Sequence, residues 1–162
     1  MTQQTDKIKI RKMTERDLPK VIAVERFVVK ENPKPIWPFS FESYWEIYNP
    51  DVSYVAETDG KLAGFIVGKI VEPERRRSVF QRWHTGEPYT TPEMIGWVDM
   101  IGILPEYQRQ GIGRRLLEAF YEECRKKGAV MRSVVYDNND RFKAVLTDMG
   151  FKESNVVIYE KV

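Results

Sequence analysis

Two glycines one residue apart, Gly111 and Gly113, stand in the stretch QRQGIG between an apolar run and an amphipathic one. The first turn of a helix offers free N–H groups and a partial positive charge, and glycines let an anion approach that backbone closely. Arg109, Arg114 and Arg115 add positive charge to the same stretch. This pattern is suited to binding a diphosphate, and a turn that merely requires glycine is the alternative.

The spacing of the glycines excludes the two common nucleotide-binding motifs. A Walker loop needs Gly-Lys-Ser/Thr, whereas Gly113 is followed by Arg114. A dinucleotide fingerprint needs a third glycine where this chain has Leu116.

A second residue with chemical potential is Asp99, the only charge in the apolar stretch 97–104. The two-residue period of a strand predicts that Trp97, Asp99, Ile101 and Ile103 share one face of a sheet. An aspartate in that position can receive a proton from a substrate. The alternative is a cap or an ion-paired residue at the start of the strand.

The elements that must position these residues follow from hydrophobic periodicity and turn residues. Asp59-Gly60 between two β-type runs predicts a hairpin, and Ser40 and Asn139 are predicted to cap helices. Cys124 falls on the apolar stripe of the helix predicted at 112–127 and is predicted to belong to the core. Strands are predicted at 7–13, 52–57, 62–70, 97–104, 129–136 and 155–162, and helices at 14–29, 41–48, 112–127 and 140–149. This order predicts a mixed sheet and an α+β or α/β class.

Composition limits the classes of function. Lys and Arg number 26 against 24 Asp and Glu, a net charge of +2, which does not favour a nucleic-acid-binding protein. No apolar run is long enough for a membrane span. The single Cys124 allows no internal disulfide and favours a reducing, cytoplasmic location, and with the single His84 it does not favour a metal site. The length predicts one domain over 7–162 after a disordered tail at 1–6.

The stretch VDMIGILPEYQRQGIGRRLLEAF resembles the signature of the GNAT superfamily of acyl-CoA N-acyltransferases. Its pattern, Gln/Arg-x-x-Gly-x-Gly/Ala after an apolar strand, is matched by Gln108, Gly111 and Gly113. A second family block, an asparagine that opens a helix ending in Gly-Phe, is similar to the stretch from Asn139 to Gly150-Phe151. The resemblance implies a three-layer fold, with a mostly antiparallel sheet of six to seven strands flanked by about four helices.

The resemblance also implies a set of site residues for acetyl-CoA. In the family, backbone N–H groups hold the coenzyme A diphosphate, and the preceding strand pairs with the pantetheine arm. The acidic residue matching Asp99 is turned toward the acyl group, and the asparagine matching Asn139 lies close to the arm. The diphosphate role maps to Arg109, Gln110, Gly111, Ile112, Gly113 and Arg114, and the pantetheine role maps to Ile101, Gly102 and Ile103.

The implied activity is acetyl transfer from acetyl-CoA to a primary amine of a small molecule or peptide, by direct attack on the thioester and without a metal. A homodimer is a possible assembly, because dimers are common in the family. The acceptor is expected between segment 30–48 and the irregular connection 72–96, both rich in aromatic residues and proline.

The chain departs from the family at the proton donor for the thiolate. Many members have a tyrosine where this chain has Leu146, and some have a glutamate where it has Val134. Tyr136 is the nearest hydroxyl by sequence, although it also suits an ordinary strand position. The alternative function is therefore a non-catalytic acyl-CoA-binding regulatory domain.

Overall fold

A five-stranded mixed sheet forms the centre of the part of the chain described by a computed structural model, namely residues 7–31, 40–72 and 94–153. The strands lie in sequence order, β1-β2-β3-β4-β5. The elements are β1 (Ile8–Lys12), η2 (Glu15–Asp17), α1 (Leu18–Glu31), α2 (Phe41–Tyr48), β2 (Val52–Thr58), β3 (Lys61–Val71), β4 (Met94–Ile103), η3 (Pro105–Tyr107), α4 (Ile112–Lys126), β5 (Ala129–Ser133) and α5 (Asp140–Asp148).

The sheet changes character at β4. Strands β1 to β4 pair antiparallel, whereas β5 pairs parallel to β4 through only the first half of that strand, from Met94↔Ala129 to Val98↔Ser133. The second half of β4, residues 99–103, continues to pair with β3 but has passed the end of β5. Strands β4 and β5 therefore part beyond Val98.

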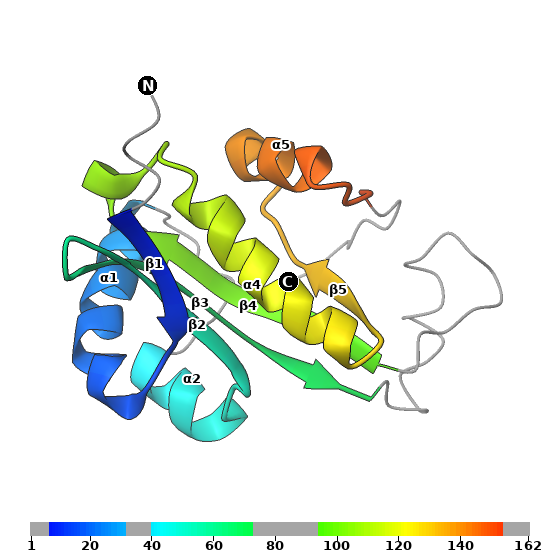
Figure 1. Cartoon of the computed structure of the whole chain (residues 1–162), viewed down its shortest axis with the longest axis horizontal. Helices are drawn as coiled ribbons and strands as arrows, with labels where there is room; N and C mark the ends of the chain where they lie inside the picture. The colour runs from blue at the N-terminus through cyan, green and yellow to red at the C-terminus, as the bar shows by residue number, and fades with distance from the viewer. Residues whose placement is uncertain (1–6, 32–39, 73–93, 154–162) are drawn as a thin grey trace, which may run out of the picture.

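Helices cover both faces of the sheet (Figure 1). Helix α4 runs along one face, and α1 and α2 lie against the other. The predicted apolar stripe of α4 is confirmed, because Ile112, Leu116, Leu117, Phe120 and Cys124 are all buried. Burial raises the pKa of the Cys124 thiol to about 11, so this cysteine is a protonated core residue, as predicted.

The opposite face has its own apolar cluster, centred on residues from α1, α2, β2 and β3. Phe41 and Tyr44 of α2 are fully buried there, and Phe41 packs edge-on against Phe65 with ring centroids 5.4 Å apart. The buried members are Val21, Val24, Phe41, Tyr44, Val55, Leu62, Phe65 and Val67. The sheet thus separates two cores, and a β4 side chain can face either of them.

The predicted class and most of the predicted elements are confirmed, although the sheet formed by the described residues has five strands where six to seven were predicted. Asp59 and Gly60 have φ of 51° and 75°, as a tight hairpin requires, and Ser40 and Asn139 accept hydrogen bonds from Ser43 N and Phe142 N as N-caps. Strand β5 is shorter than predicted and ends at Ser133, where its pairing with β4 also ends. The predicted tail 1–6, most of the connection 72–96 and the last strand at 155–162 lie outside the described residues.

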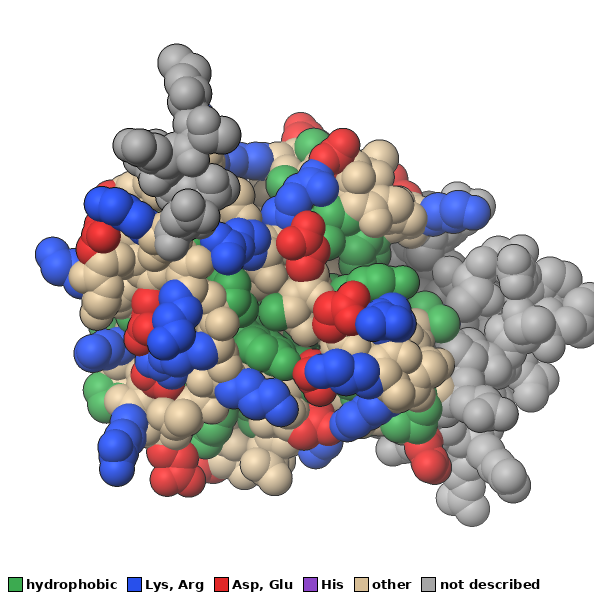
Figure 2. Space-filling model, in the orientation of Figure 1, with side chains coloured by type: hydrophobic (Ala, Val, Ile, Leu, Met, Phe, Trp, Pro, Cys, Tyr) green, Lys and Arg blue, Asp and Glu red, His purple; other side chains and the backbone are tan. Residues whose placement is uncertain are grey.

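Basic and acidic side chains are interspersed over the face of the molecule that carries α4, with apolar side chains between them (Figure 2). Within the described ranges, no helix combines the length and apolarity needed to cross a bilayer.

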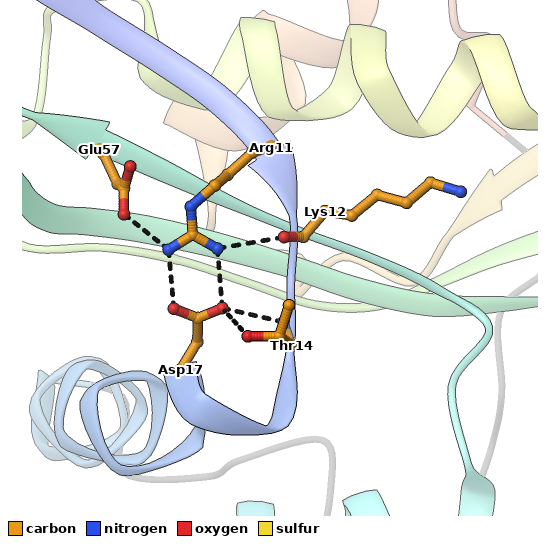
Figure 3. Close-up of polar contacts among 5 residues, drawn as sticks. All are labelled: Arg11, Lys12, Thr14, Asp17 and Glu57. Atoms are coloured by element: carbon orange, nitrogen blue, oxygen red, sulfur yellow. Dashed lines mark hydrogen bonds and ion pairs between the residues drawn. The ribbon is translucent and has the colours of Figure 1, made fainter.

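A charged cluster ties β1 to the turn that leads into α1 (Figure 3). The Arg11 guanidinium donates two hydrogen bonds of 2.8 Å to the Asp17 carboxylate and one of 2.6 Å to Glu57 Oε1. Thr14 donates from its backbone N and from Oγ1 to Asp17 Oδ2, at 2.8 and 2.9 Å. These hydrogen bonds, those from Arg11 first, hold the pKa of the buried Asp17 carboxyl well below its usual value.

Asp17→Asn is expected to lower the free energy of unfolding at pH 7 by about 2 kcal/mol, the scale of hydrogen bonds to charged groups. Because the folded-state pKa of Asp17 is depressed, its contribution is present above the unfolded pKa of about 3.9 and is lost as the pH falls further. Urea unfolding of both proteins between pH 7 and pH 3 should show the difference narrowing below about pH 4. An unchanged difference down to pH 3 would contradict this account.

Candidate functional site

A β-bulge at Asp99 is the main local irregularity of β4. Val67 of β3 is opposite Met100, whereas the next residue, Gly68, is opposite Val98, so Asp99 is an extra residue on β4. Bulges of this kind re-aim a side chain and recur next to active sites.

The bulge overturns the predicted arrangement of the β4 side chains. Ile101 and Ile103 pack into the core on the α4 side, whereas Met100 packs into the core on the α1 and α2 side. Asp99 reaches α2 as well, so two consecutive residues face the same side of the sheet. The prediction that Asp99 shares a face with Ile101 and Ile103 is therefore wrong, because a strict two-residue period does not survive a bulge.

The Asp99 carboxylate is held by a tyrosine of α2. Tyr44 Oη donates a hydrogen bond of 2.7 Å to Asp99 Oδ2, and the Tyr44 ring is fully buried. Burial raises the pKa of Asp99, although the Tyr44 hydrogen bond and the charge of Lys69 act in the opposite direction. The pKa of Tyr44 is raised far above its usual value, first by burial and then by Asp99, so the phenol stays a donor. An oriented carboxylate of raised pKa is suited to accepting a proton.

The glycine loop forms a strand-loop-helix connection at the end of β4. Gly111 is the N-cap of α4 with φ of 79°, and Arg109 also has a left-handed backbone, with φ of 62°. The first backbone bond along α4 runs from Arg115 N to Gly111 O, so the N–H groups of residues 112–114 precede it. A Cβ at Gly111 would meet nothing within 4 Å, which leaves this helix start open to an anion.

Contacts with β4 and with α5 hold this loop in place. Gln108 Nε2 donates to Ile103 O at 3.1 Å, while Gln108 Oε1 accepts from Arg141 of α5 at 3.1 Å. Arg114 forms an ion pair with Asp148, at the other end of α5. Arg141 therefore joins the basic residues of the loop, although the sequence pattern did not single it out.

The predicted coenzyme A residues converge on one region of the fold. Residues 101–103 form the end of β4 beyond β5, and residues 109–114 follow directly as the loop and first turn of α4. The Ile112 side chain is core, so only its backbone N–H can serve a ligand. Asn139 Oδ1 caps α5, which leaves its amide nitrogen for the pantetheine arm. Their roles toward a ligand stay predictions.

The three positions considered for the thiolate's proton donor differ in burial. Leu146 is buried in the core on the α4 side, and Val134 is exposed. The Tyr136 hydroxyl is buried and has no hydrogen-bond partner within the described structure, and burial raises its pKa. Among the residues with described positions, no group of three or more His, Cys, Asp or Glu side chains is placed to hold a metal ion.

Comparison with known proteins identifies the family. The model of the Acetyltransferase (GNAT) family matches residues 19–151. The chain belongs to the GNAT family of acetyltransferases. The half-paired β4, its bulge and the glycine loop all lie inside the matched range.

Two curated relatives give the level of similarity in sequence. Mycothiol acetyltransferase of Frankia alni is 31% identical over 105 residues, which is 64% of this chain and 29% of that protein. The [ribosomal protein bS18]-alanine N-acetyltransferase of Escherichia coli K12 is 39% identical over 57 residues, 35% of this chain and 38% of that protein. The matches thus span only about a third of the length of these relatives.

Solved structures confirm the GNAT fold over nearly the whole chain. The aminoglycoside acetyltransferase AAC(6')-Iy, in complex with a bisubstrate analogue of coenzyme A, has a TM-score of 0.69 at 21% identity and covers 96% of this chain and 97% of its own. The metagenomic aminoglycoside acetyltransferase meta-AAC0020 with sisomicin, from uncultured soil, has a TM-score of 0.67 at 21% identity and covers 98% of both chains.

Proposed function

We propose that this GNAT protein is an acetyl-CoA-dependent N-acetyltransferase that moves an acetyl group to a primary amine of a small molecule or peptide. The observation that carries the proposal is Asp99, which the bulge turns toward α2 at the point where β4 loses β5 as a partner. The open helix start at Gly111 lies at the end of the same strand. Asp99 on β4 and the helix start that follows β4 along the chain would thus serve as base and donor site.

The backbone of the loop would hold the donor. The N–H groups of residues 112–114 would bind the diphosphate, and the β4 edge at residues 101–103 would pair with the pantetheine arm. Bound there, acetyl-CoA supplies a thioester that an amine can attack directly. Arg109 and Arg141 would add charge at the phosphates, because the helix start alone contributes only about 0.3–1 kcal/mol per exposed charge.

Asp99 would act on the acceptor. A lysine-like amine of pKa about 10.4 is neutral about once in 2,500 molecules at pH 7, a penalty near 4.6 kcal/mol, whereas an α-amine near pKa 8 pays about 1.4 kcal/mol. Asp99 receives or relays the ammonium proton and so lowers this penalty, and Tyr44 positions its carboxylate. Tyr136, with its buried and unpartnered hydroxyl, is the donor we favour for the departing thiolate.

A non-catalytic acyl-CoA-binding domain is the second candidate, favoured by the buried Leu146 at the family's tyrosine position. Thiol release from acetyl-CoA with a panel of primary amines separates the two candidates. An acetyltransferase releases thiol in the presence of at least one amine, with one acetylated amine formed per thiol. A regulatory domain binds coenzyme A and releases no thiol with any of them.

Gly111→Glu is expected to weaken coenzyme A binding by about 10- to 100-fold, because a carboxylate at the open helix start repels the diphosphate and displaces hydrogen bonds of about 1.5–3 kcal/mol. Calorimetric titration measures the loss. The matched control is Gly128→Glu, after the other end of α4: its φ is 64°, and a Cβ there also meets nothing within 4 Å. Both variants carry the same backbone strain and charge, so equal losses of affinity would refute a diphosphate site at Gly111.

A further inference from the structure

Arg132 of β5 is a half-buried arginine whose terminal guanidinium nitrogens have no hydrogen-bond partner among the described residues. Both terminal nitrogens of its guanidinium are inaccessible to solvent, and neither has a hydrogen-bond partner within the described structure. Burial lowers the pKa of Arg132, but an arginine remains charged in proteins. An unpaired buried charge costs several kcal/mol of free energy. A bound anion would lower this cost by pairing with the guanidinium.

The position of Arg132 places it on the same side of the sheet as Asp99. Its neighbour Met131 packs into the core on the α4 side, so Arg132 faces the opposite side. It pairs in register with Trp97, and its guanidinium carbon lies 5.8 Å from the centroid of the Trp97 ring. Asp99 follows Trp97 by two residues on β4 and reaches Tyr44 on that same side.

The contact with Trp97 does not account for burying the charge. A cation–π contact contributes about 0.5–2 kcal/mol, less than the cost of an unpaired buried ion. Lys69 is opposite Trp97 on β3, and it donates to the Tyr48 carbonyl oxygen at 3.0 Å. The Trp97 ring therefore orients the guanidinium and leaves its hydrogen-bonding end for another group.

We propose that Arg132 binds a carboxylate of the acceptor, so that the substrates are amines that also carry a carboxylate group. The inference rests on the proposed acetyl transfer and adds the class of acceptor. Two adjacent guanidinium nitrogens match the two oxygens of a carboxylate in a bidentate pair. Such a substrate carries charges of both signs, and Asp99 and Arg132 are complementary to its ammonium and carboxylate.

The spacing along β4 indicates how far apart the two groups stand. Arg132 pairs with Trp97, and the proposed base, Asp99, is two residues further along β4. Residues two apart on a strand are separated by about 7 Å, which sets the scale of the distance between the two charged groups. An amino group and a carboxylate several bonds apart can reach both side chains, whereas glycine cannot. We therefore expect ω-amino carboxylates of intermediate length to be better acceptors than glycine.

The test compares two series of primary amines at matched chain length, the ω-amino carboxylates from glycine to 6-aminohexanoate and the corresponding n-alkylamines. Thiol release from acetyl-CoA gives kcat/KM for each. Wild type should prefer the carboxylates by tenfold or more. Arg132→Gln should raise KM for the carboxylates by about 10- to 100-fold, the equivalent of one charged hydrogen-bonded pair, and leave the alkylamines unchanged.

Two controls separate recognition from folding. Arg125→Gln, at an exposed position of α4 where Arg125 pairs with Glu122, makes the same charge change and should leave the preference intact. Arg132→Met should not lower the urea midpoint, because an apolar side chain replaces an unpaired buried charge. A loss of stability in Arg132→Met, together with equal losses of kcat/KM for both series in Arg132→Gln, would show a structural role and overturn the proposal.

The remaining outcomes are also distinct. If wild type acetylates alkylamines as well as ω-amino carboxylates, acetyl transfer stands and the role of Arg132 is refuted. If wild type acetylates neither series, acetyl transfer to simple amines is refuted. Calorimetric titration of 5-aminovalerate into wild type and Arg132→Gln then decides the anion site, which requires binding to wild type and loss of binding in the variant.

Discussion

Replacing Asp99 by asparagine is expected to reduce kcat by about 10²- to 10⁴-fold, the usual contribution of a positioned general base. Asparagine keeps the shape of the side chain and can still accept from Tyr44 Oη, but it cannot take a proton from an ammonium group. The coenzyme A affinity should stay nearly unchanged, because Asp99 lies within β4 whereas the glycine loop begins only after the end of that strand. Thiol-release kinetics and calorimetric titration of the same preparations measure the two quantities.

Comparing acceptor amines of different pKa distinguishes proton transfer by Asp99 from a structural role. The loss in Asp99→Asn should be larger for an amine of pKa about 10.4 than for one near 8, and it should narrow as the pH approaches the amine pKa. A loss that is equal for both amines at every pH would indicate that Asp99 supports the structure instead of moving a proton. Unchanged turnover would remove Asp99 from the mechanism.

Tyr44→Phe provides the companion measurement for a positioning residue. The Tyr44 hydrogen bond lowers the pKa of Asp99, so its removal lets that pKa rise further. Because Asp99 must be ionised to act as a base, the acid limb of the kcat profile should move to higher pH, by about one to two units for a hydrogen bond of about 1.5–3 kcal/mol.

Replacing Gly68 by alanine is expected to lower the free energy of unfolding by roughly 3 kcal/mol or more, at the upper end of overpacking costs. A Cβ there would overlap the Trp97 carbonyl oxygen and would lie 2.8 and 2.9 Å from two carbons of the buried Phe120 ring. Neither neighbour is the end of a flexible side chain, so the backbone of β4 must move. Urea unfolding measures the loss.

Gly68 is opposite Val98, next to the bulge, so the same substitution should also disturb Asp99. We expect the folded fraction of Gly68→Ala to retain coenzyme A binding and to lose turnover. Gly128→Ala is the control for removing a glycine, because a Cβ at Gly128 has open space and only its φ of 64° is strained, at about 1–2 kcal/mol. A loss in Gly68→Ala no larger than in Gly128→Ala would contradict the clash with β4.

Local patterns predicted the parts of this fold that depend on local physics. The stripe through Phe120 and Cys124, the turn at Asp59-Gly60 and the caps at Ser40 and Asn139 each need only neighbours within one element, and all were confirmed. The GNAT signature is also contiguous, which is why the family and the fold could be predicted from it.

The parts that sequence reasoning missed depend on register between strands. The bulge at Asp99 lies next to Gly68 of β3, whose missing Cβ leaves room for the Trp97 carbonyl oxygen, and no periodicity within β4 reveals it. The Tyr44 bond to Asp99 spans 55 positions of the chain. Arg132 belongs to no motif in the sequence, because only the parallel pairing of β5 with β4 brings it beside Trp97.

The proposed donor and acceptor sides differ in whether main-chain groups or side chains form them, and this difference affects how such a protein can diverge. In the proposed function, the donor would be held by main-chain groups, namely the β4 edge and the first N–H groups of α4, which almost any sequence that keeps the fold will present. The acceptor would instead be bound by individual side chains beside the bulge at Asp99. A gene can therefore change its acceptor by single substitutions and keep its acyl donor, which makes this architecture easy to duplicate and specialise.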